Sequence, residues 1–449
     1  MKVLLISPNA LITPYPVYPL GLDYVADAIR AEHEVKILDI NVLGGLEALG
    51  KAVRENTPDM VGISIRNIDN TDKTNLYGFM EDYQACVETV RKHTQAPVVL
   101  GGSGFTLFPE QVMGDLKAEY GVVGEGERLA ALLRAMEKGE DLSRIPGVMT
   151  RYTSKDACIP FDRAFSLSSL PERSQLQYYL QNGGMLNLQT KRGCPFKCIY
   201  CTYPRIEGKR LRRIPPEAAA ARALRLQEAG ARYFFVTDAA FNADYVHSAR
   251  VAEAFMDAGV SIPWGAFFAP TAPPDGYFRT LADAGLTHVE FGTESLSNEM
   301  LAVYRKPFRV DQVIKAHERA LEAGLYVAHY FLLGGPGEDE KTINETLSSI
   351  SRLEKSVYIF FCAVRIYPHT ALYDIAVDAG QISRDQSILT PVFYEPERIG
   401  SDKIVQRLSE RAGGRFNWVT GTGGEAAAKV IPRLYSRGHT GPLWEHLIR

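Results

Sequence analysis

Residues 185–201 read MLNLQTKRGCPFKCIYC and carry an apolar strand directly into three closely spaced cysteines. The strand, Met185–Thr190, is short and apolar, as expected of a strand buried in a parallel sheet. Gly193 and Pro195 follow it, and both favour a loop with unusual backbone angles beside a bulky group. This stretch therefore predicts a metal-binding loop at the end of a buried strand.

The cysteines are separated by three and then two residues, so Cys194, Cys198 and Cys201 can surround one metal centre from a single loop. Cysteine thiolates bind iron–sulfur clusters, and a cubane cluster has four irons. Three protein ligands leave the fourth iron open, and an open position marks a reactive centre rather than a purely structural one. A zinc site would need a fourth ligand, and neither His nor Cys follows at a suitable spacing. The loop therefore predicts a [4Fe-4S] cluster.

A repeated strand–helix pattern surrounds this loop. The dipeptide Ala-Gly ends five amphipathic helices, and an apolar strand usually follows; glycine supplies the left-handed residue that ends a helix. The dipeptides lie at 229–230, 258–259, 284–285, 323–324 and 379–380. The expected strands are Met185–Thr190, Tyr233–Thr237, Pro263–Phe268, His288–Phe291, Val327–Leu333 and Val357–Arg365. They predict a partial (β/α)6 TIM-type barrel, whose active-site residues lie at the carboxyl ends of its strands.

The first part of the chain alternates strands and helices in a different arrangement. Its expected strands are Lys2–Ser7, Glu34–Asp39, Met60–Ile65, Val98–Leu100 and Gly121–Val123. Such alternation predicts a Rossmann-like α/β domain with a doubly wound parallel sheet, whose ligands lie beyond the carboxyl ends of the strands. Small and polar residues stand at those ends, where they fit a ligand site and ordinary turns equally well.

The two patterns divide the chain into four parts. We expect a doubly wound domain at 1–137, a linker at 138–180, the barrel at 181–375 and a small, mostly helical region at 376–449. A chain of 449 residues is too long for one core, so several domains are the natural expectation.

Charge and composition limit the partners. The net charge is −3 with no basic block, which gives no sign of a nucleic-acid partner. No stretch approaches the roughly 18 apolar residues of a membrane span, and the short apolar run before Pro8 does not resemble a signal peptide. We therefore expect a cytoplasmic protein with reduced thiols and no membrane partner.

The cysteine loop, with aromatic Tyr200 before its last cysteine, resembles the signature of radical S-adenosylmethionine enzymes. Supporting motifs recur down the barrel as FVTD at 235–238, FGTES at 291–295 and FLLGGPGE at 331–338. In that family S-adenosylmethionine chelates the open iron, and an electron from the cluster splits it to a 5′-deoxyadenosyl radical. The resemblance implies that this cosubstrate contacts Tyr200, Asp238, Glu294, Gly334, Gly335 and Gly337.

The resemblance gives these residues separate roles. It places the Tyr200 segment beside the adenine and Glu294 beside the methionyl amine. Two assignments keep an alternative: Asp238 could equally cap the next helix, and the glycines at 334–337 could form an ordinary strand-to-helix turn.

The amino-terminal domain resembles the cobalamin-binding domain that precedes the barrel in one large subclass of these enzymes. The likeness is carried by YPLG at 18–21, VGIS at 61–64, LGGS at 100–103 and VGEGE at 123–127. It implies cobalamin contacts by Tyr18, Ser64, Gly101, Gly102, Gly124 and Glu125. Domains that bind cobalt through histidine carry Asp-x-His-x-x-Gly, whereas Tyr18 stands at the histidine position here. That departure removes histidine as the lower ligand and leaves open a domain that has kept the fold but lost cobalamin.

Taken together, the resemblances imply a cobalamin-dependent radical methyltransferase of class B. It would methylate an unactivated carbon of a small metabolite or peptide and draw electrons from an external one-electron donor of flavodoxin or ferredoxin type. One alternative is a cyclase or ring-rearranging enzyme of the same architecture without methyl transfer. Another is a non-catalytic iron–sulfur or cobalamin-binding carrier or sensor.

Several other residues at strand ends are weaker candidates. Arg66 and Asn67 would contact cobalamin or substrate, whereas Asp69 and Asp72 fit a solvated loop. A further set could touch substrate or equally be structural: His329, Tyr330, Arg365, Tyr367 and His369. Of the remaining cysteines, Cys86 and Cys362 are expected in the core and Cys158 has no assignment.

Overall fold

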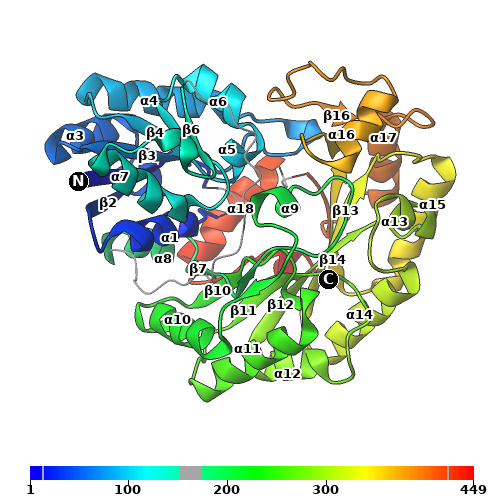
Figure 1. The fold of residues 1–449 in the computed structure, drawn as a ribbon. Helices are drawn as coiled ribbons and strands as arrows, with labels where there is room; N and C mark the ends of the chain where they lie inside the picture. The colour runs from blue at the N-terminus through cyan, green and yellow to red at the C-terminus, as the bar shows by residue number, and fades with distance from the viewer. Residues whose placement is uncertain (13–14, 152–164, 166–172, 422–423, 449) are drawn as a thin grey trace.

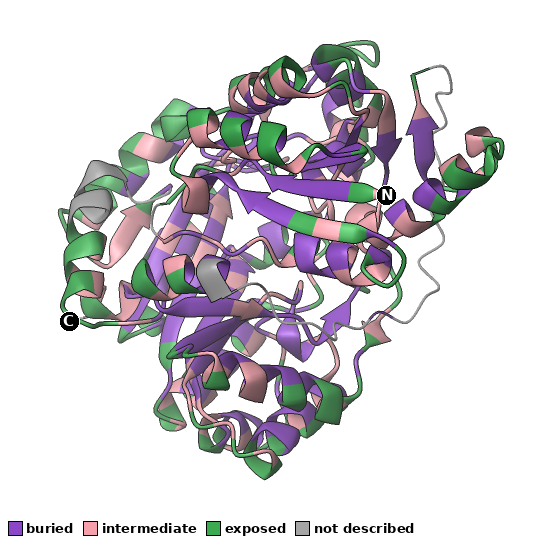
Figure 2. Ribbon diagram, turned by 90° about the vertical axis from the view of Figure 1, so that its left-hand side faces the viewer, coloured by how far each residue is buried: buried purple, intermediate pink, exposed green. Residues whose placement is uncertain are grey.

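Two sheets organise the computed structural model of the chain, and both consist mainly of parallel strands (Figure 1). The structure describes residues 1–448 apart from 13–14, 152–164, 166–172 and 422–423. The strands are largely buried, whereas the outward faces of the helices are exposed (Figure 2). Within the described residues, no helix is long and apolar enough to cross a membrane.

The first sheet has the strand order β2-β1-β3-β4-β5-β6, in which only β6 is antiparallel to its neighbour. Its strands are β1 Lys2–Ser7, β2 Glu34–Asp39, β3 Met60–Ser64, β4 Val98–Gly101, β5 Tyr120–Val122 and β6 Val148–Thr150. The connections after β1 and β3 leave in opposite directions, which opens a crevice at the carboxyl ends of these two strands.

Helices cover both faces of this sheet, which confirms the predicted doubly wound domain. One face packs against α3 Leu46–Asn56, α4 Met80–His93 and α6 Pro109–Leu116. The other face packs against α1 Leu20–Ile29 and α7 Leu129–Lys138. Two short helices, α2 Ile40–Leu43 and α5 Ser103–Leu107, follow β2 and β4 directly.

Regular structure also occupies 138–180, the segment expected to be a linker. β6 completes the first sheet, and α8 Arg173–Gln181 binds the end of β2. In α8, the Gln175 amide donates to the Ile37 carbonyl at 2.8 Å, and the Tyr179 hydroxyl donates to Asp39 at 2.7 Å. Cys158, which lies in this segment, is outside the described residues.

The second sheet contains all six strands expected of the partial barrel, in sequential and parallel order. Its strands are β7 Met185–Leu188, β10 Tyr233–Val236, β11 Trp264–Phe268, β12 Leu286–Glu294, β13 Tyr326–Leu333, β14 Ser356–Cys362 and β17 Trp418–Thr420. The end strands β7 and β17 are not paired with each other among the described residues, so the sheet stays open.

The carboxyl-terminal region is mostly helical, as predicted, but it also supplies a seventh strand that was not expected. β17 pairs with β14 through the register Tyr358↔Trp418 to Phe360↔Thr420. Three residues are too few to show a strand period, and the interpretation therefore missed β17. The two helices expected there are present, as α17 Ser401–Ala412 and α18 Gly424–Ser436.

Every helix expected to end at an Ala-Gly dipeptide does so. In each case alanine is the last cap residue, and the following glycine has a positive φ between 71° and 101°. These helices are α10 Pro216–Glu228, α11 Tyr245–Asp257, α12 Tyr277–Asp283, α14 Val310–Glu322 and α16 Ala371–Asp378. The shorter elements of the second domain are β8 Lys191–Arg192, β9 Arg212–Arg213, β15 Val364–Arg365, β16 Phe393–Tyr394, α9 Tyr203–Ile206, α13 Asn298–Val303 and α15 Glu340–Ser349.

Candidate active site

The cysteine loop begins at a small antiparallel pair of strands, β8 and β9, which brings its two ends together. The Cys194 backbone N–H donates to the Gly208 carbonyl at 3.1 Å. Gly193 has a φ of 89°, and a Cβ at this position would overlap the carbonyl oxygen of Arg210. Only glycine fits here, because the loop both turns left-handed and crosses its own chain.

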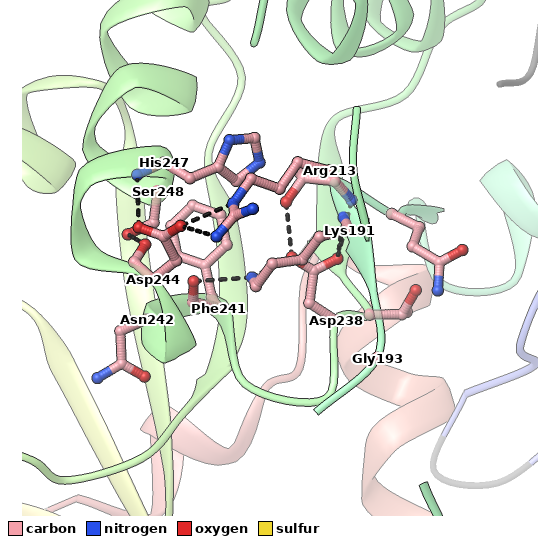
Figure 3. A network of polar contacts seen from close by, with 12 residues as sticks. Lys191, Gly193, Arg213, Asp238, Phe241, Asn242, Asp244, His247 and Ser248 are labelled. Atoms are coloured by element: carbon pink, nitrogen blue, oxygen red, sulfur yellow. Dashed lines mark hydrogen bonds and ion pairs between the residues drawn. The ribbon is translucent and has the colours of Figure 1, made fainter. Parts of the chain in front are cut away.

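Asp238 fixes the start of this loop from the end of β10 (Figure 3). Its carboxylate accepts from the backbone and hydroxyl of Thr190 at 2.8 and 2.6 Å and from the Lys191 ammonium at 2.6 Å. The Asp238 side chain is 0% exposed and that of Lys191 is 1% exposed. The alternative that Asp238 caps the next helix is wrong, because Asp244 caps α11 instead. Its direct contact with a cosubstrate stays a prediction.

The three cysteines line the loop as buried or half-buried thiols. Burial raises the pKa of the Cys201 thiol to about 12, and the neighbouring Cys198 and Cys194 raise it further. Among the described residues, no three His, Cys, Asp or Glu side chains converge as ligands of one metal ion. A cubane takes each thiolate on a different iron, so three thiols need not converge on one point to hold a cluster, whereas a single zinc ion would require it.

Glu294 lies beside the cysteine loop at the end of β12. Its carboxylate accepts from the Tyr200 hydroxyl at 2.7 Å and pairs with the Lys306 ammonium at 2.8 Å. The backbone of Glu294 is left-handed, with a φ of 58°, at a register shift between β12 and β13. Burial alone would lower the pKa of Lys306, but Glu294 and the Cys198 thiol outweigh it and raise that pKa.

Three glycines follow β13, and packing within the protein leaves little room for a side chain at two of them, Gly334 and Gly335. A Cβ at Gly334 would lie 3.2 Å from the Cα of Ala363, and one at Gly335 would overlap the Tyr304 ring. Gly337 has a φ of 80° and open space around it. Packing thus explains Gly334 and Gly335, while cosubstrate contact by the three glycines stays a prediction.

A cavity of about 330 Å³ opens at the carboxyl edge of the first sheet. All six residues predicted to contact cobalamin line it, namely Tyr18, Ser64, Gly101, Gly102, Gly124 and Glu125. Gly102 has a φ of 103°, and a Cβ there would lie 2.6 Å from the Ile65 carbonyl oxygen. The structure therefore brings this predicted set together in the crevice where such sheets bind ligands.

Tyr18, at the position of the missing histidine, directs its hydroxyl into the protein. The hydroxyl donates to Asp23 at 2.7 Å, and the ring packs edge-on against Tyr179. Burial, followed by the negative charge of Asp23, raises the pKa of Tyr18 well above its ordinary value. The neutral, already bonded phenol is therefore not a substitute for a histidine ligand to cobalt.

Arg192 joins the cysteine loop to the first domain. Its guanidinium donates to Glu125 at 3.0 Å and to Glu127 at 2.6 Å, and it lies 4.5 and 4.3 Å from the ring centroids of Tyr24 and Phe165. Because Arg192 and Glu125 both line the first cavity, this contact connects that cavity to the segment that carries the cysteines.

A larger cavity, of about 1750 Å³, lies between the first domain and the inside of the second sheet. The two cavities share Arg66, Ser103, Tyr203, Ile206 and Glu207 as lining residues. Tyr203 and Ile206 belong to α9, which directly follows the last cysteine. A single-ligand pocket measures roughly 300–1,000 Å³, so this space is large enough for more than one bound molecule.

The loop around Asp69 is not solvated, contrary to one interpretation of its sequence. Asp69 is 3% exposed and accepts from Arg365 at 2.9 Å and from the Tyr367 hydroxyl at 3.3 Å. Asp72 is equally buried. The reason is that the loop packs against the second domain, a contact that local polarity does not reveal.

The remaining candidates separate by position. Arg66, Asn67, Tyr330 and Tyr367 line the larger cavity, whereas His329 is fully buried and contacts Thr293 and His317 behind the sheet. Cys86 and Cys362 are in the core, as predicted.

Three charged residues of the site escaped the sequence interpretation: Arg192, Glu290 and Lys306. Arg192 lies two residues before Cys194, and Glu290 directly precedes the FGTES motif at 291–295. Their closeness to these two motifs was a signal that the sequence offered. Lys306 follows α13 with no motif around it, and only its contact with Glu294 identifies it.

Two family models match the chain. The Radical SAM superfamily matches residues 188–350 and the B12 binding domain matches residues 9–134. These ranges coincide with most of the second and first sheets, respectively.

Two named relatives match most of the chain. The tryptophan 2-C-methyltransferase of Streptomyces laurentii is 26% identical in an alignment 445 residues long that covers 82% of this chain and 73% of that protein. The cytidylyl-2-hydroxyethylphosphonate methyltransferase of Streptomyces wedmorensis is 24% identical, over 79% of this chain and 77% of that protein.

A solved structure shows the same fold. The radical S-adenosylmethionine methyltransferase TsrM from Kitasatospora setae, with tryptophan substrate and the analogue aza-SAM bound, has a TM-score of 0.86 at 21% identity. The match covers 99% of this chain and 97% of that one. A second structure of TsrM, with cobalamin and a [4Fe-4S] cluster bound, has a TM-score of 0.84.

Proposed function

The chain is a radical SAM protein with a B12-binding domain, and from that premise we propose that it is a cobalamin-dependent methyltransferase. Its substrate is a small molecule or peptide with an unactivated carbon that accepts the methyl group. The observation that carries the proposal is the shared wall of the two cavities, because α9, beside the cysteines, borders both of them.

The residues present fit the three groups that this reaction needs. Cys194, Cys198 and Cys201 would hold a [4Fe-4S] cluster, since all three are free thiols carried by one loop. The cavity at the first sheet would take part of cobalamin, since it opens at the carboxyl ends of β1 and β3, where such sheets bind ligands. When bound, the cluster supplies the electron that cleaves S-adenosylmethionine, and cobalamin carries the methyl group.

The chain's own side chains orient these groups. Glu294, already held by Tyr200 and Lys306, presents a carboxylate to the methionyl amine of S-adenosylmethionine. Asp238 keeps the loop in register with the end of β10. Arg192 holds the first domain against the loop, so that the two cavities stay adjacent.

We extend the proposal to the surroundings of the enzyme. An external one-electron donor of flavodoxin or ferredoxin type would reduce the cluster. A cytoplasmic location would keep the cysteine thiols reduced and available.

Coproducts test this function directly. The protein is reconstituted without oxygen, given reductant, S-adenosylmethionine and candidate small-molecule substrates, and assayed with and without cobalamin. Methyl transfer predicts S-adenosylhomocysteine and a methylated product that both depend on cobalamin. A preparation that releases 5′-deoxyadenosine but never S-adenosylhomocysteine would instead be a rearranging enzyme.

Matched cysteine variants test the cluster. Cys198→Ala should lose most of the bound iron and sulfide, whereas Cys86→Ala, which truncates a core cysteine far from the loop in sequence, should keep them. Full cluster content in Cys198→Ala would contradict the ligand assignment.

A further inference from the structure

Glu290 is a buried carboxylate inside the barrel that the cofactor sites do not use. It lies on β12 four residues before Glu294, and the register shift between Gly292 and Glu294 separates the two. At about 3.3 Å per residue, the two positions are roughly 13 Å apart along the strand. Glu290 is therefore deeper in the barrel than the carboxylate proposed for the cosubstrate.

Two neutral donors hold the carboxylate in place. The Trp444 indole N–H donates to one oxygen at 2.9 Å, and the Tyr330 hydroxyl donates to the other at 2.7 Å. Glu290 is only 3% exposed, and within the described part of the chain no Lys or Arg pairs with it. The nearby His288 forms its own pair with Glu445 at 3.1 Å.

Glu290 nevertheless borders a cavity. Glu290, Tyr330 and Trp444 all line the cavity of about 1750 Å³, together with Tyr15 from the loop after β1. A carboxylate has about four acceptor positions, and the two donors occupy only two of them. The remaining positions are available to a ligand in a space walled by aromatic rings, which also attract cations.

The charge of Glu290 is unfavourable without a ligand. Burial raises its pKa, which the two hydrogen bonds and the neighbouring His288 only partly oppose. A buried carboxylate is normally paired with a cation, because an isolated charge loses its hydration. If the two donors were the only requirement, a neutral glutamine could accept from them without this penalty.

We propose that Glu290 binds a protonated amine of the substrate, which makes the substrate an amine or amino acid with an aromatic or apolar body. The proposal rests on the function proposed above, since it assigns the large cavity to the substrate. The ammonium would complete the missing ion pair, and the rings of Tyr15, Tyr330 and Trp444 would surround the adjoining carbons. This amine differs from that of the cosubstrate, which has its own carboxylate in Glu294.

Binding of two matched probes tests the proposal without catalysis. The reconstituted full-length protein, with cluster, cobalamin and S-adenosylmethionine, is dialysed to equilibrium against 2-phenylethylamine or against the neutral 2-phenylethanol. We expect the amine to bind about tenfold or more tightly than the alcohol at pH 7. Glu290→Gln should abolish this preference and leave the affinity for the alcohol unchanged.

Two variants separate charge from structure. Tyr330→Phe removes one hydrogen bond but keeps the carboxylate, so it should retain the preference for the amine. Glu299→Gln, on the exposed start of α13, should change neither affinity. Cobalamin content and thermal melting report whether each variant is folded.

Equal affinities for amine and alcohol in the wild type would overturn the proposal, as would a preference that survives in Glu290→Gln. Failure of both probes to bind at millimolar concentration would also count against it. Formation of S-adenosylhomocysteine is measured in the same preparations, so a failed methyltransferase assignment remains distinguishable from a failed amine site.

Discussion

The buried ion pair below the cysteine loop gives the sharpest test of how this site is held. Asp238→Asn keeps the size of the side chain but removes its charge. The Lys191 ammonium would then be a buried cation with neutral acceptors alone, the Phe241 carbonyl at 2.8 Å and the asparagine amide oxygen. Figure 3 shows this network, in which Asp238 lies between the loop and the end of β10.

The size of the effect follows from the burial of the pair. Both side chains are at most 1% exposed, and removal of one partner from such a pair typically costs about 3–5 kcal/mol. A folding unit of 150–250 residues loses about 2–4 °C of melting temperature per kcal/mol. Since the second domain is of that size, we expect Asp238→Asn to lower its melting temperature by at least about 6 °C.

Calorimetry of the cluster-free protein measures this shift, and a double variant identifies its cause. Lys191→Met combined with Asp238→Asn removes both charges, and apolar replacement of a buried pair is often close to neutral. The double variant should therefore recover at least half of the lost stability. Asp244→Asn is the matched control. The Asp244 carboxylate is partly exposed, and asparagine would cap α11 about as well as aspartate does.

Two results would refute this reasoning. One is a melting temperature of Asp238→Asn within a degree or two of the wild type. The other is a double variant that is less stable than Asp238→Asn alone, since the buried charge of Lys191 could not then be the source of the loss.

Three further variants test other parts of the site. Glu294→Gln should raise the Kd for S-adenosylmethionine in equilibrium dialysis by roughly 10–100-fold through loss of a charge-assisted hydrogen bond, whereas Glu299→Gln should not. Gly102→Ala should destabilise the first domain in urea titration by at least about 2 kcal/mol, because a left-handed φ and a carbonyl clash combine there; Gly44→Ala, with open space, should lose less. Burial raises the pKa of Glu338 to about 7, so the folded state holds its proton between pH 4.5 and 7, and stability falls as pH rises. The free energy of unfolding of the wild type relative to Glu338→Gln should therefore drop by up to about 3 kcal/mol from pH 5 to pH 8; a constant difference would contradict that pKa.

Local patterns were sufficient for most of the fold. Each Ala-Gly dipeptide marked a helix end, because the left-handed glycine needs no partner elsewhere in the chain. Apolar runs such as Lys2–Ser7 identified buried strands for the same reason. β17 escaped because its pairing with β14, rather than its own three residues, makes it a strand.

Contacts between the domains could not be predicted in this way. Asp69 has the local sequence of a solvated loop, and only its pairing with Arg365, 296 residues later, makes it a buried anchor. The pattern at Tyr18 showed that histidine is missing, but the bond to Asp23 shows that the phenol does not replace it. Both outcomes depend on side-chain partners that periodicity does not encode.

At Glu294 the sequence motif and the strained backbone point to the same functional position. The sequence placed a carboxylate at the end of a barrel strand, where active-site residues of such barrels lie. The structure adds that its φ is 58°, a region that is unfavourable for residues other than glycine by about 1–3 kcal/mol. Such strain persists only where surrounding contacts hold it, and here Tyr200 and Lys306 do so from two sides. Because both contacts come from the chain itself, they orient the carboxylate beside the cysteine loop and reduce what binding must supply to place it there.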